Sequence, residues 1–280
     1  MSFKCLGIFR EKTNSPNRET DDTLILKGVT EELSRLGCET HLIEPENINL
    51  INPEDWDIIL PMCENLSNVL KLAKWQSSFL INNVDAVLNC YRDKMTDILQ
   101  KEASRFYPKT EKRLIENFPG TKPPDFFTEK GCWIKRGDVH NTCTHDVHFI
   151  KDWNDCEKVK TDFKSRKIKS VIAQDHIQGD LIKFYGIGPY KWFDWFYHRP
   201  QELSNFKFNL SDLEQAAGEI AKFIGLEIYG GDAIITPESE IYVIDINSWP
   251  SFARVREEAK IHIARHIYSR KPVKIMGAKK

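Results

Sequence analysis

Two apolar runs near the carboxyl end decide the fold: GGDAII at residues 230–235 and IYVIDIN at residues 241–247. Their length and their β-branched residues predict two strands, joined by a short turn that contains a proline. Asp232 lies on the first run, and Asp245 and Asn247 lie on the second. Because side chains two apart on a strand point to the same face, we expect Asp245 and Asn247 to face one way together.

These three polar side chains have the chemistry of a magnesium site. Two carboxylates and one amide oxygen are hard ligands, which suit a Mg²⁺ ion that keeps some waters and also binds substrate phosphates. The sequence therefore predicts that Asp232, Asp245 and Asn247 hold one or two Mg²⁺ ions, and it indicates nucleotide chemistry. In the alternative interpretation, Asp232 is a turn residue and Asn247 caps a loop.

The composition is that of a globular protein without bulk attraction to nucleic acid. The chain has 280 residues, of which 41% are hydrophobic and 29% are charged, and its formal net charge is −1. This length allows two or three lobes with cores of their own. The charge gives no support to a nucleic-acid or anionic-membrane partner. The sequence also has no apolar run of about 18 residues, so no membrane span is expected.

The seven cysteines indicate a cytoplasmic protein. Their number is odd, they contain no Cys-x-x-Cys pair, and several lie within apolar runs. We expect them to be reduced and mostly structural. The opening residues have too short an apolar run for a signal peptide, which fits the same expectation.

The first 88 residues alternate between strand and helix patterns. Apolar residues recur at helical spacing from Leu26 to Leu36, and Gly37 follows as a natural helix end. Such alternation predicts a doubly wound parallel sheet with ligand-binding loops at its carboxyl edge. Strands are expected at 5–9, 40–44, 57–62 and 84–88, and helices at 26–36 and 66–80.

The remaining sequence predicts two further lobes that mix strands and helices. Helices are expected at 94–104, 211–225 and 252–268, and strands at 132–135 and from 171 onward. We therefore expect an amino-terminal α/β domain at 1–88, a central lobe at 89–172 and a carboxyl-terminal lobe with the metal site at 173–280.

An ordered set of short motifs resembles the ATP-grasp superfamily over roughly residues 85–268. The set consists of Asn89, Arg92-Asp93-Lys94, Ile134-Lys135, Val171–Asp175, Gly179–Gly188, Asp232 and Ile244–Pro250. The resemblance implies an ATP-grasp fold preceded by the doubly wound α/β domain. Within the superfamily, the chain resembles carboxylate-amine ligases of the glutathione synthetase, D-alanine ligase and ribosomal-protein glutamate ligase type, with features of the inositol polyphosphate kinase branch.

The resemblance implies an ATP site between two β-lobes. Lys94 and Lys135 would bind the nucleotide phosphates as point charges. Gln174 and Asp175 would lie at the hinge, where backbone groups contact the adenine edge and a carboxylate holds the ribose hydroxyls. Alternatively, the lysines are solvated surface residues, and Gln174 and Asp175 are a polar pair at a strand end.

Two further residues are catalytic candidates. Lys183 lies in an otherwise apolar strand and should face a cleft, because an unpaired buried charge is costly. Ligase-type relatives commonly have arginine there, over the transferring phosphoryl group, whereas lysine occurs in the inositol kinase branch; the resemblance also makes Lys183 an ATP-binding residue.

His145 is the second catalytic candidate, because the dipeptide Thr144-His145 resembles a Ser-His dipeptide of inositol phosphate kinases. It lies in the segment 136–148, at the place of the family's phosphate-covering loop, which here has only one glycine, Gly137. A surface loop without a catalytic role is the alternative. The three histidines of the segment match no standard spacing for a transition metal.

The resemblance implies that Ser251 and Arg254, which follow the metal strand, contact the acceptor substrate. They lie at a helix entry, where free backbone N–H groups favour an anion. Arg254 is also a catalytic candidate. Arg10 and Arg18 flank the loop after the first strand, at the carboxyl edge where α/β sheets place ligands. In the alternative interpretation this loop is an ordinary solvated one.

Three functions stay open from the sequence. The first is Mg²⁺-ATP-dependent phosphorylation of a small-molecule carboxylate, followed by capture of the acyl phosphate by an amine. The second is phosphoryl transfer to a polyol such as an inositol phosphate. The third is an inactive nucleotide-binding regulatory module. The expected partner is a small-molecule acceptor, and a homodimer is possible because many relatives are dimers.

Overall fold

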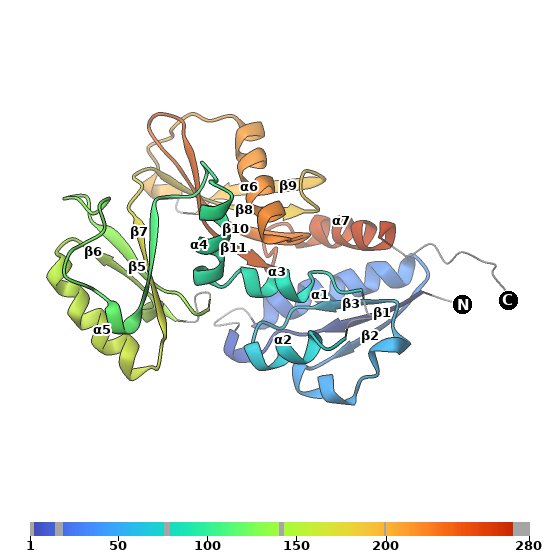
Figure 1. The fold of residues 1–280 in the computed structure, drawn as a ribbon. Coiled ribbons are helices and arrows are strands. Elements are labelled where there is room, and N and C mark those ends of the chain that lie inside the picture. Colours follow the sequence, from blue (N-terminus) through green and yellow to red (C-terminus); the bar gives the residue numbers. More distant parts are fainter. Residues whose placement is uncertain (1–2, 15–18, 76–78, 140–142, 199, 271–280) are drawn as a thin grey trace. The chain divides into compact units, whose positions relative to one another are not determined.

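The computed structural model describes residues 3–14, 19–75, 79–139, 143–198 and 200–270. The chain forms two compact units: residues 1–84 together with 251–280, and residues 85–250. The colours of Figure 1 follow the chain through both units. The domain boundaries expected after residues 88 and 172 stay predictions.

The first unit contains a three-stranded parallel sheet in the order β2-β1-β3, as the alternating sequence pattern predicted. Its strands are β1 (Phe3–Ile8), β2 (Cys38–Ile43) and β3 (Ile58–Pro61). Leu80 adds a parallel bridge beside Ile59. The backbone amide of Ile59 donates to the carbonyl of Phe79 at 2.8 Å, and that of Ile81 donates to the carbonyl of Ile59 at 3.0 Å.

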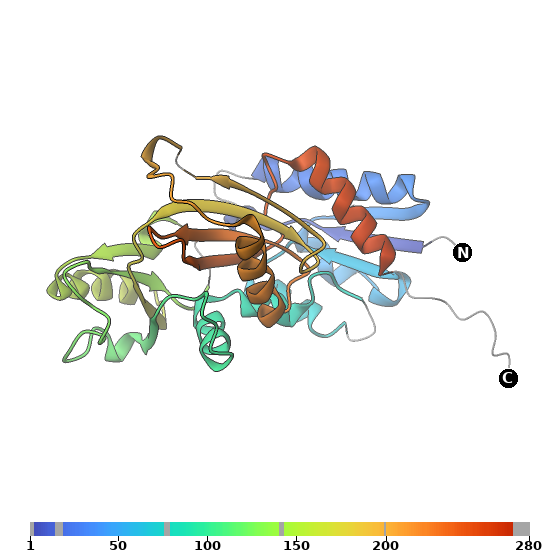
Figure 2. The same ribbon diagram turned by 90° about the horizontal axis from the view of Figure 1, so that it is seen from above.

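The helices of the first unit are α1 (Glu19–Arg35), α2 (Leu66–Leu72) and, from the carboxyl end of the chain, α7 (Arg256–Ser269). Helix α1 ends just before Gly37, whose φ of 85° only glycine adopts without strain. Helices α1 and α7 pack side by side (Figure 2). The guanidinium of Arg256 donates to the Asp21 carboxylate across this contact.

The prediction of a strand at residues 84–88 is wrong. This segment forms the helix α3 (Val84–Asn89), with Ala86 and Val87 buried. A short apolar run does not distinguish a buried strand from a buried helix. The place beside β3 is occupied by residues 79–81 instead. The helix expected at 66–80 is also shorter, since α2 ends at Leu72.

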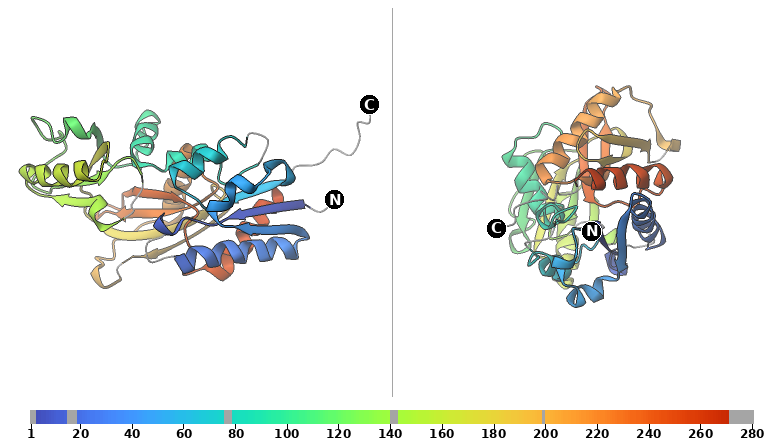
Figure 3. Two further views of the ribbon diagram at one scale, coloured as in Figure 1. Left: turned by 90° about the horizontal axis from the view of Figure 1, so that it is seen from below. Right: turned by 90° about the vertical axis from the view of Figure 1, so that its right-hand side faces the viewer.

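The second unit contains two antiparallel four-stranded sheets. The first has the order β4-β7-β5-β6 and the second the order β11-β10-β8-β9. Figure 3 gives two further views of the ribbon. The strands are β4 (Thr110–Leu114), β5 (Cys132–Arg136), β6 (Val147–Ile150), β7 (Ser170–Asp175), β8 (Asp180–Ile187), β9 (Trp192–Tyr197), β10 (Ile228–Ile235) and β11 (Ile241–Ser248).

Three longer helices complete this unit: α4 (Arg92–Lys101), α5 (Cys156–Ser165) and α6 (Leu210–Ile224). Phe163 of α5 is buried against the first sheet, and Ile220 of α6 is buried against the second. Short 3-10 helices lie at Lys12–Asn14, Pro45–Leu50, Pro53–Asp55, Ile115–Asn117, Thr144–Asp146, Trp153–Asp155 and Pro200–Glu202. Among the residues that the structure describes, no helix has both the length and the apolar character needed to cross a membrane.

The hairpin predicted from residues 230–247 is confirmed. Strands β10 and β11 pair antiparallel with Asp232 opposite Asp245. On the other side of β10, Lys183 of β8 is opposite Asp232. The neighbours of Lys183 on its strand, Ile182 and Phe184, are fully buried in the core that α6 covers. Because side chains alternate along a strand, Lys183 lies on the opposite face of the sheet, with Asp232.

We expect a substitution of Gly231 by alanine to destabilise this hairpin. A Cβ atom at Gly231 would lie 2.2 Å from the carbonyl oxygen of Asp245 and 2.7 Å from the Phe184 ring. The strands would have to separate, at a cost of about 1–3 kcal/mol in the free energy of unfolding. Chemical denaturation measures this cost, with Lys222→Ala on the exposed side of α6 as the control. Equal stability of Gly231→Ala and the wild type would contradict the close strand contact.

Candidate active site

The second unit contains a cavity of about 530 Å³ that is lined by residues of both sheets. Five residues predicted from the sequence contribute to its wall: Lys135, Gln174, Asp175, Asp232 and Asp245. The other lining residues are Arg92, Trp133, Val147, His176, Ile177, Gln178, Gly179, Leu181, Ile234 and Ile244. The cavity therefore combines cations, carboxylates and an apolar portion.

Lys135 is a buried cation in the wall of this cavity. Its Nζ donates to Gln174 Oε1 at 2.6 Å and to the carbonyl oxygen of Ile244 at 3.2 Å. Burial lowers the pKa of Lys135 to about 8; nearby Arg92 lowers it too, while Asp245 and Asp232 oppose the shift. The ammonium therefore loses its charge as the pH rises through about 8.

Gln174 fixes this lysine. It is almost completely buried on β7, and its Nε2 donates to Thr110 Oγ1 at 3.3 Å while its Oε1 accepts from Lys135. Because both ends of the carboxamide are bonded, its orientation is defined. The next residue, Asp175, lies at the end of β7, and burial raises the pKa of its carboxyl.

Trp133 and His176 form an aromatic corner of the cavity. The indole Nε1 of Trp133 donates to His176 Nδ1 at 3.1 Å. Burial lowers the pKa of His176, which fits a neutral imidazole that accepts this bond. Neither residue was predicted from the sequence to belong to the site.

Arg92 is a second cation of the cavity, and the sequence analysis assigned it no role. Its side chain is 4% exposed, and its Nη2 lies 3.5 Å from Asp245 Oδ2. Its Nη1 donates to the carbonyl oxygen of Arg136 at 3.4 Å. The sequence could have indicated that Arg92 faces inward, because the apolar residues Met95 and Leu99 follow it at i+3 and i+7. In the structure all three residues are buried on the same side of α4.

Asp232 and Asp245 differ in what their oxygens contact. Oδ1 of Asp232 accepts from Lys183 Nζ at 2.6 Å. Asp245 faces Arg92 through Oδ2, whereas its Oδ1 is buried and has no hydrogen-bond partner in the part of the chain that is described. Such an orphaned oxygen is expected where a ligand or ion binds. Asn247 is half-buried two positions further along β11, and neither Asn247 nor Lys183 is part of the cavity wall.

Lys94 and His145 lie away from the cavity wall. Lys94 is exposed on α4, two residues from Arg92 and therefore on another side of the helix. His145 is exposed in the 3-10 helix Thr144–Asp146, where its carbonyl oxygen accepts from Arg166 Nη1 at 3.1 Å. His140, considered for a transition metal, lies outside the described residues.

The residues predicted to meet the acceptor belong to the first unit. Ser251 is buried and Arg254 is exposed. Arg18 lies outside the described residues. The Nη1 of Arg10 donates to Glu64 Oε1 at 2.6 Å, and its Nε lies 3.3 Å from a carboxylate oxygen of Asp22. This guanidinium is thus held by two buried carboxylates at the carboxyl edge of the parallel sheet.

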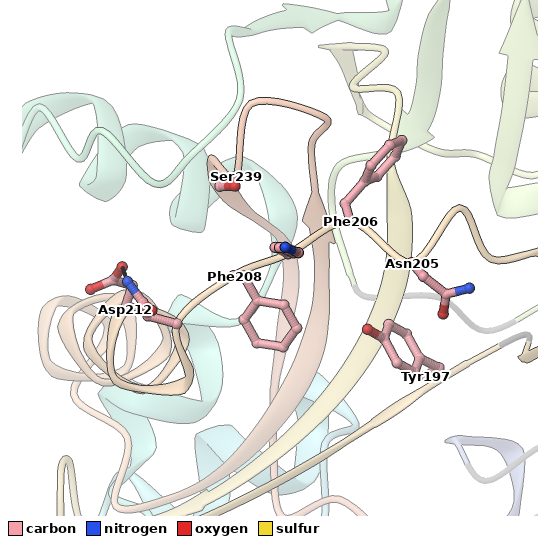
Figure 4. A pocket seen from close by; sticks show the side chains of 8 residues that line it. Tyr197, Asn205, Phe206, Phe208, Asp212 and Ser239 are labelled. Atoms are coloured by element: carbon pink, nitrogen blue, oxygen red, sulfur yellow. Dashed lines mark hydrogen bonds between the residues drawn. The ribbon is translucent and has the colours of Figure 1, made fainter.

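A separate hollow of about 490 Å³ lies beside the turn between β10 and β11 and the start of α6 (Figure 4). Residues 205–208 line this hollow. Their segment is held by buried Asp180, whose carboxylate accepts from the backbone amides of Ser204 at 2.7 Å and Phe206 at 2.9 Å. It contains none of the residues predicted from the sequence. Its lining consists of Tyr197, Asn205, Phe206, Lys207, Phe208, Asn209, Asp212 and Ser239.

The chain thus combines a three-stranded parallel sheet in one unit with two four-stranded antiparallel sheets that line a polar cavity in the other. No family model and no curated protein matches the sequence. Among solved structures, the chain is similar to a RimK domain ATP-grasp protein from Sphaerobacter thermophilus, with a TM-score of 0.67, 14% identity, and coverage of 96% of this chain and 98% of that one.

Two further solved structures are similar over nearly the whole chain. A D-alanine–D-alanine ligase from Bacillus anthracis, complexed with ATP, has a TM-score of 0.66 at 12% identity, covering 96% of this chain and 95% of that one. The ATP-grasp ligase PsnB, complexed with a minimal precursor, has a TM-score of 0.61 at 14% identity, covering 96% and 99%. The chain has the ATP-grasp fold.

Proposed function

We propose that this chain is an ATP-grasp ligase that uses Mg²⁺-ATP to join a small-molecule carboxylate to an amine through an acyl phosphate. One observation carries the proposal: a single cavity gathers two cations, Arg92 and Lys135, and three carboxylates, of which Asp232 and Asp245 lie opposite each other on neighbouring strands. That combination suits a polyphosphate with its metal. The similar solved structures include three ligases or ligase-like proteins, one of them with ATP, which supports the same class.

In this proposal the two ends of the cavity have different roles. Lys135 and Arg92 attract the phosphates, and Gln174 holds the lysine in place. The apolar residues Ile177, Leu181 and Ile234 accept the base, and the carboxylate of Asp175 binds the ribose hydroxyls. Lys94 was also predicted to bind the phosphates. Its side chain is exposed outside the cavity wall, so it would have to turn towards the bound nucleotide to do so.

The residues fit a divalent cation that takes its other ligands from the phosphates of ATP and from water. Asp245 offers a buried oxygen without a hydrogen-bond partner among the described residues, and Asp232 lies opposite it on the neighbouring strand. Together with Asn247 these residues would hold Mg²⁺, as one or two ions. When bound, Mg²⁺ neutralises charge on the ATP phosphates.

The protein's part in the reaction is positioning and charge stabilisation. A carboxylate oxygen of the acceptor attacks the γ-phosphorus as the bond to ADP breaks, and the amine then displaces phosphate from the acyl carbon. Lys183 is the proposed cation beside the transferring group. His145 and Arg254 are further catalytic candidates, and the acceptor residues are proposed to be Ser251, Arg254, Arg10 and Arg18. A homodimer, a cytoplasmic location and the absence of nucleic-acid and membrane partners also stay proposals.

Phosphoryl transfer to a polyol is the second candidate, because lysine rather than arginine occupies position 183. The two reactions differ in their products. Release of free phosphate that requires both a carboxylate and an amine identifies the ligase. A stable phosphate ester without phosphate release identifies the kinase. ATP that binds but is never turned over across a broad acceptor panel identifies a regulatory module.

We expect Mg²⁺-ATP at millimolar concentration to raise the melting temperature by several degrees. A ligand at about 100 times its Kd stabilises the folded state by about 2.7 kcal/mol. Differential scanning calorimetry with Mg²⁺ alone, with ATP alone and with both measures the effect. An unchanged melting temperature with both ligands would contradict the nucleotide site itself.

A further inference from the structure

The contact between Lys183 and Asp232 joins neighbouring strands at the metal residues. The two residues are opposite each other in the pairing of β8 and β10, and Nζ lies 2.6 Å from Oδ1. Their side chains are 27% and 25% exposed, so the pair is neither buried nor fully solvated. In such a position an ion pair has an appreciable Coulomb energy. One carboxylate that would hold a cation is therefore already neutralised by an ammonium group.

The other carboxylate is only partly available. Asp245 Oδ2 faces the Arg92 guanidinium at 3.5 Å, and only Oδ1 has no hydrogen-bond partner among the residues described. The structure, over its described ranges, also gathers no group of three His, Cys, Asp or Glu side chains as a metal site. The protein alone thus supplies too few free oxygens for a hard divalent cation, which takes six or more.

From these contacts we propose that Lys183 occupies the place of a divalent cation at Asp232 in the nucleotide-free protein, so that metal binds strongly only together with ATP. This inference rests on the proposed function. The metal, arriving with its phosphate ligands, displaces the ammonium from Asp232. Lys183 then pairs with a phosphate oxygen, so that each cation exchanges one anionic partner for another.

The strand geometry allows this exchange without a change of backbone. Ile182 and Phe184 are fully buried on the other face of the sheet, so β8 itself is fixed. The lysine side chain has four rotatable carbon bonds and a compact ammonium group that forms bonds in several directions. Only the side chain of Lys183 has to move, and its partial exposure leaves room for that movement.

Binding of Mn²⁺ to the nucleotide-free protein, measured by electron paramagnetic resonance, tests the inference directly. Removing the ammonium with Lys183→Met is expected to tighten Mn²⁺ binding about tenfold or more, because the charge at Asp232 is no longer neutralised. The control is Lys158→Met, which removes a lysine from an exposed ion pair of 2.7 Å with Asp155 and should leave Mn²⁺ affinity unchanged. Lys183→Gln serves as a second variant in case the methionine variant does not fold.

Addition of a non-hydrolysable ATP analogue completes the test. In the wild type the analogue should tighten Mn²⁺ binding by a large factor, and in Lys183→Met this dependence should be much smaller. Equal Mn²⁺ affinity of the free wild type and both Lys183 variants would overturn the inference. Calorimetry with ATP on the wild type distinguishes the two proposals. ATP binding by the wild type, with unaltered Mn²⁺ affinity in the variants, refutes only the exchange. Absence of ATP binding by the wild type refutes the nucleotide function and the ATP-coupled exchange with it, even if the variants bind Mn²⁺ more tightly.

Discussion

Asp245→Asn is expected to lower Mg²⁺-dependent ATP turnover by roughly 1,000-fold while the protein remains folded. The carboxylate provides the buried Oδ1 that has no hydrogen-bond partner among the described residues, at the place where a metal would bind. Loss of a metal ligand removes several kcal/mol of charge stabilisation in phosphoryl transfer, and about 4 kcal/mol corresponds to that factor in rate. The amide has the same shape as the carboxylate, so the packing of β11 is retained.

The measurement is ADP formation in a coupled assay, together with circular dichroism melting. Some loss of stability is expected, because the Arg92 guanidinium 3.5 Å away loses its counter-charge. Asp97→Asn is the matched control, since Asp97 forms an exposed ion pair with Lys112 in the same unit. Undiminished turnover in Asp245→Asn, with Mg²⁺ present, would refute the metal assignment.

The central hairpin was predictable because local rules agreed there. Two short β-branched runs with a proline-containing turn predict antiparallel strands, and the two-residue period of a strand places Asp245 and Asn247 on one face. The structure pairs Asp232 with Asp245 across the strands. No long-range information was needed for this part of the site, and the order of the remaining motifs indicated the fold.

Other parts depended on packing that the sequence does not specify. Residues 84–88 have the composition of a strand, yet the position beside β3 is taken by residues 79–81, and the segment becomes a helix. Whether Arg92 or Lys94 faces the cavity depends on which side of α4 packs inward, since residues two apart on a helix point to different sides. The buried partners Met95 and Leu99 place Arg92 on the side of α4 that faces the cavity.

We expect ATP affinity to fall as the pH rises through about 8, and Lys135 to be the cause. The lysine carries its charge below its pKa of about 8 and loses it above. Approaching phosphates favour the charged form, so binding above pH 8 takes up one proton and Kd rises by up to tenfold for each pH unit. Isothermal titration calorimetry from roughly pH 7.5 to 9.5 measures this; a nucleotide phosphate, with a pKa of about 6, is ionised throughout.

Two variants identify the titrating group. Lys135→Arg keeps a positive charge over the whole range and should remove the pH dependence. Lys135→Met should weaken ATP binding by about 10- to 100-fold at pH 7.5, which is the effect of losing one hydrogen bond to a charged group. The same fall of affinity with pH in both variants would assign the titration to another group.

The ligand-free protein provides a test of opposite sign for the same lysine. The pKa of Lys135 is lowered from 10.5 to about 8 in the folded chain, so between these values the unfolded chain binds the additional proton. The free energy of unfolding contributed by this group is therefore lowest below pH 8 and rises towards pH 10.5.

Other lysines, tyrosines and cysteines titrate in the same range, but they contribute equally to wild type and Lys135→Met. The difference in stability between the two proteins should thus increase in favour of the wild type as the pH rises, while ATP affinity of the wild type falls. A buried phosphate-binding lysine predicts both trends, whereas a lysine that only fills space between the sheets predicts the stability trend alone.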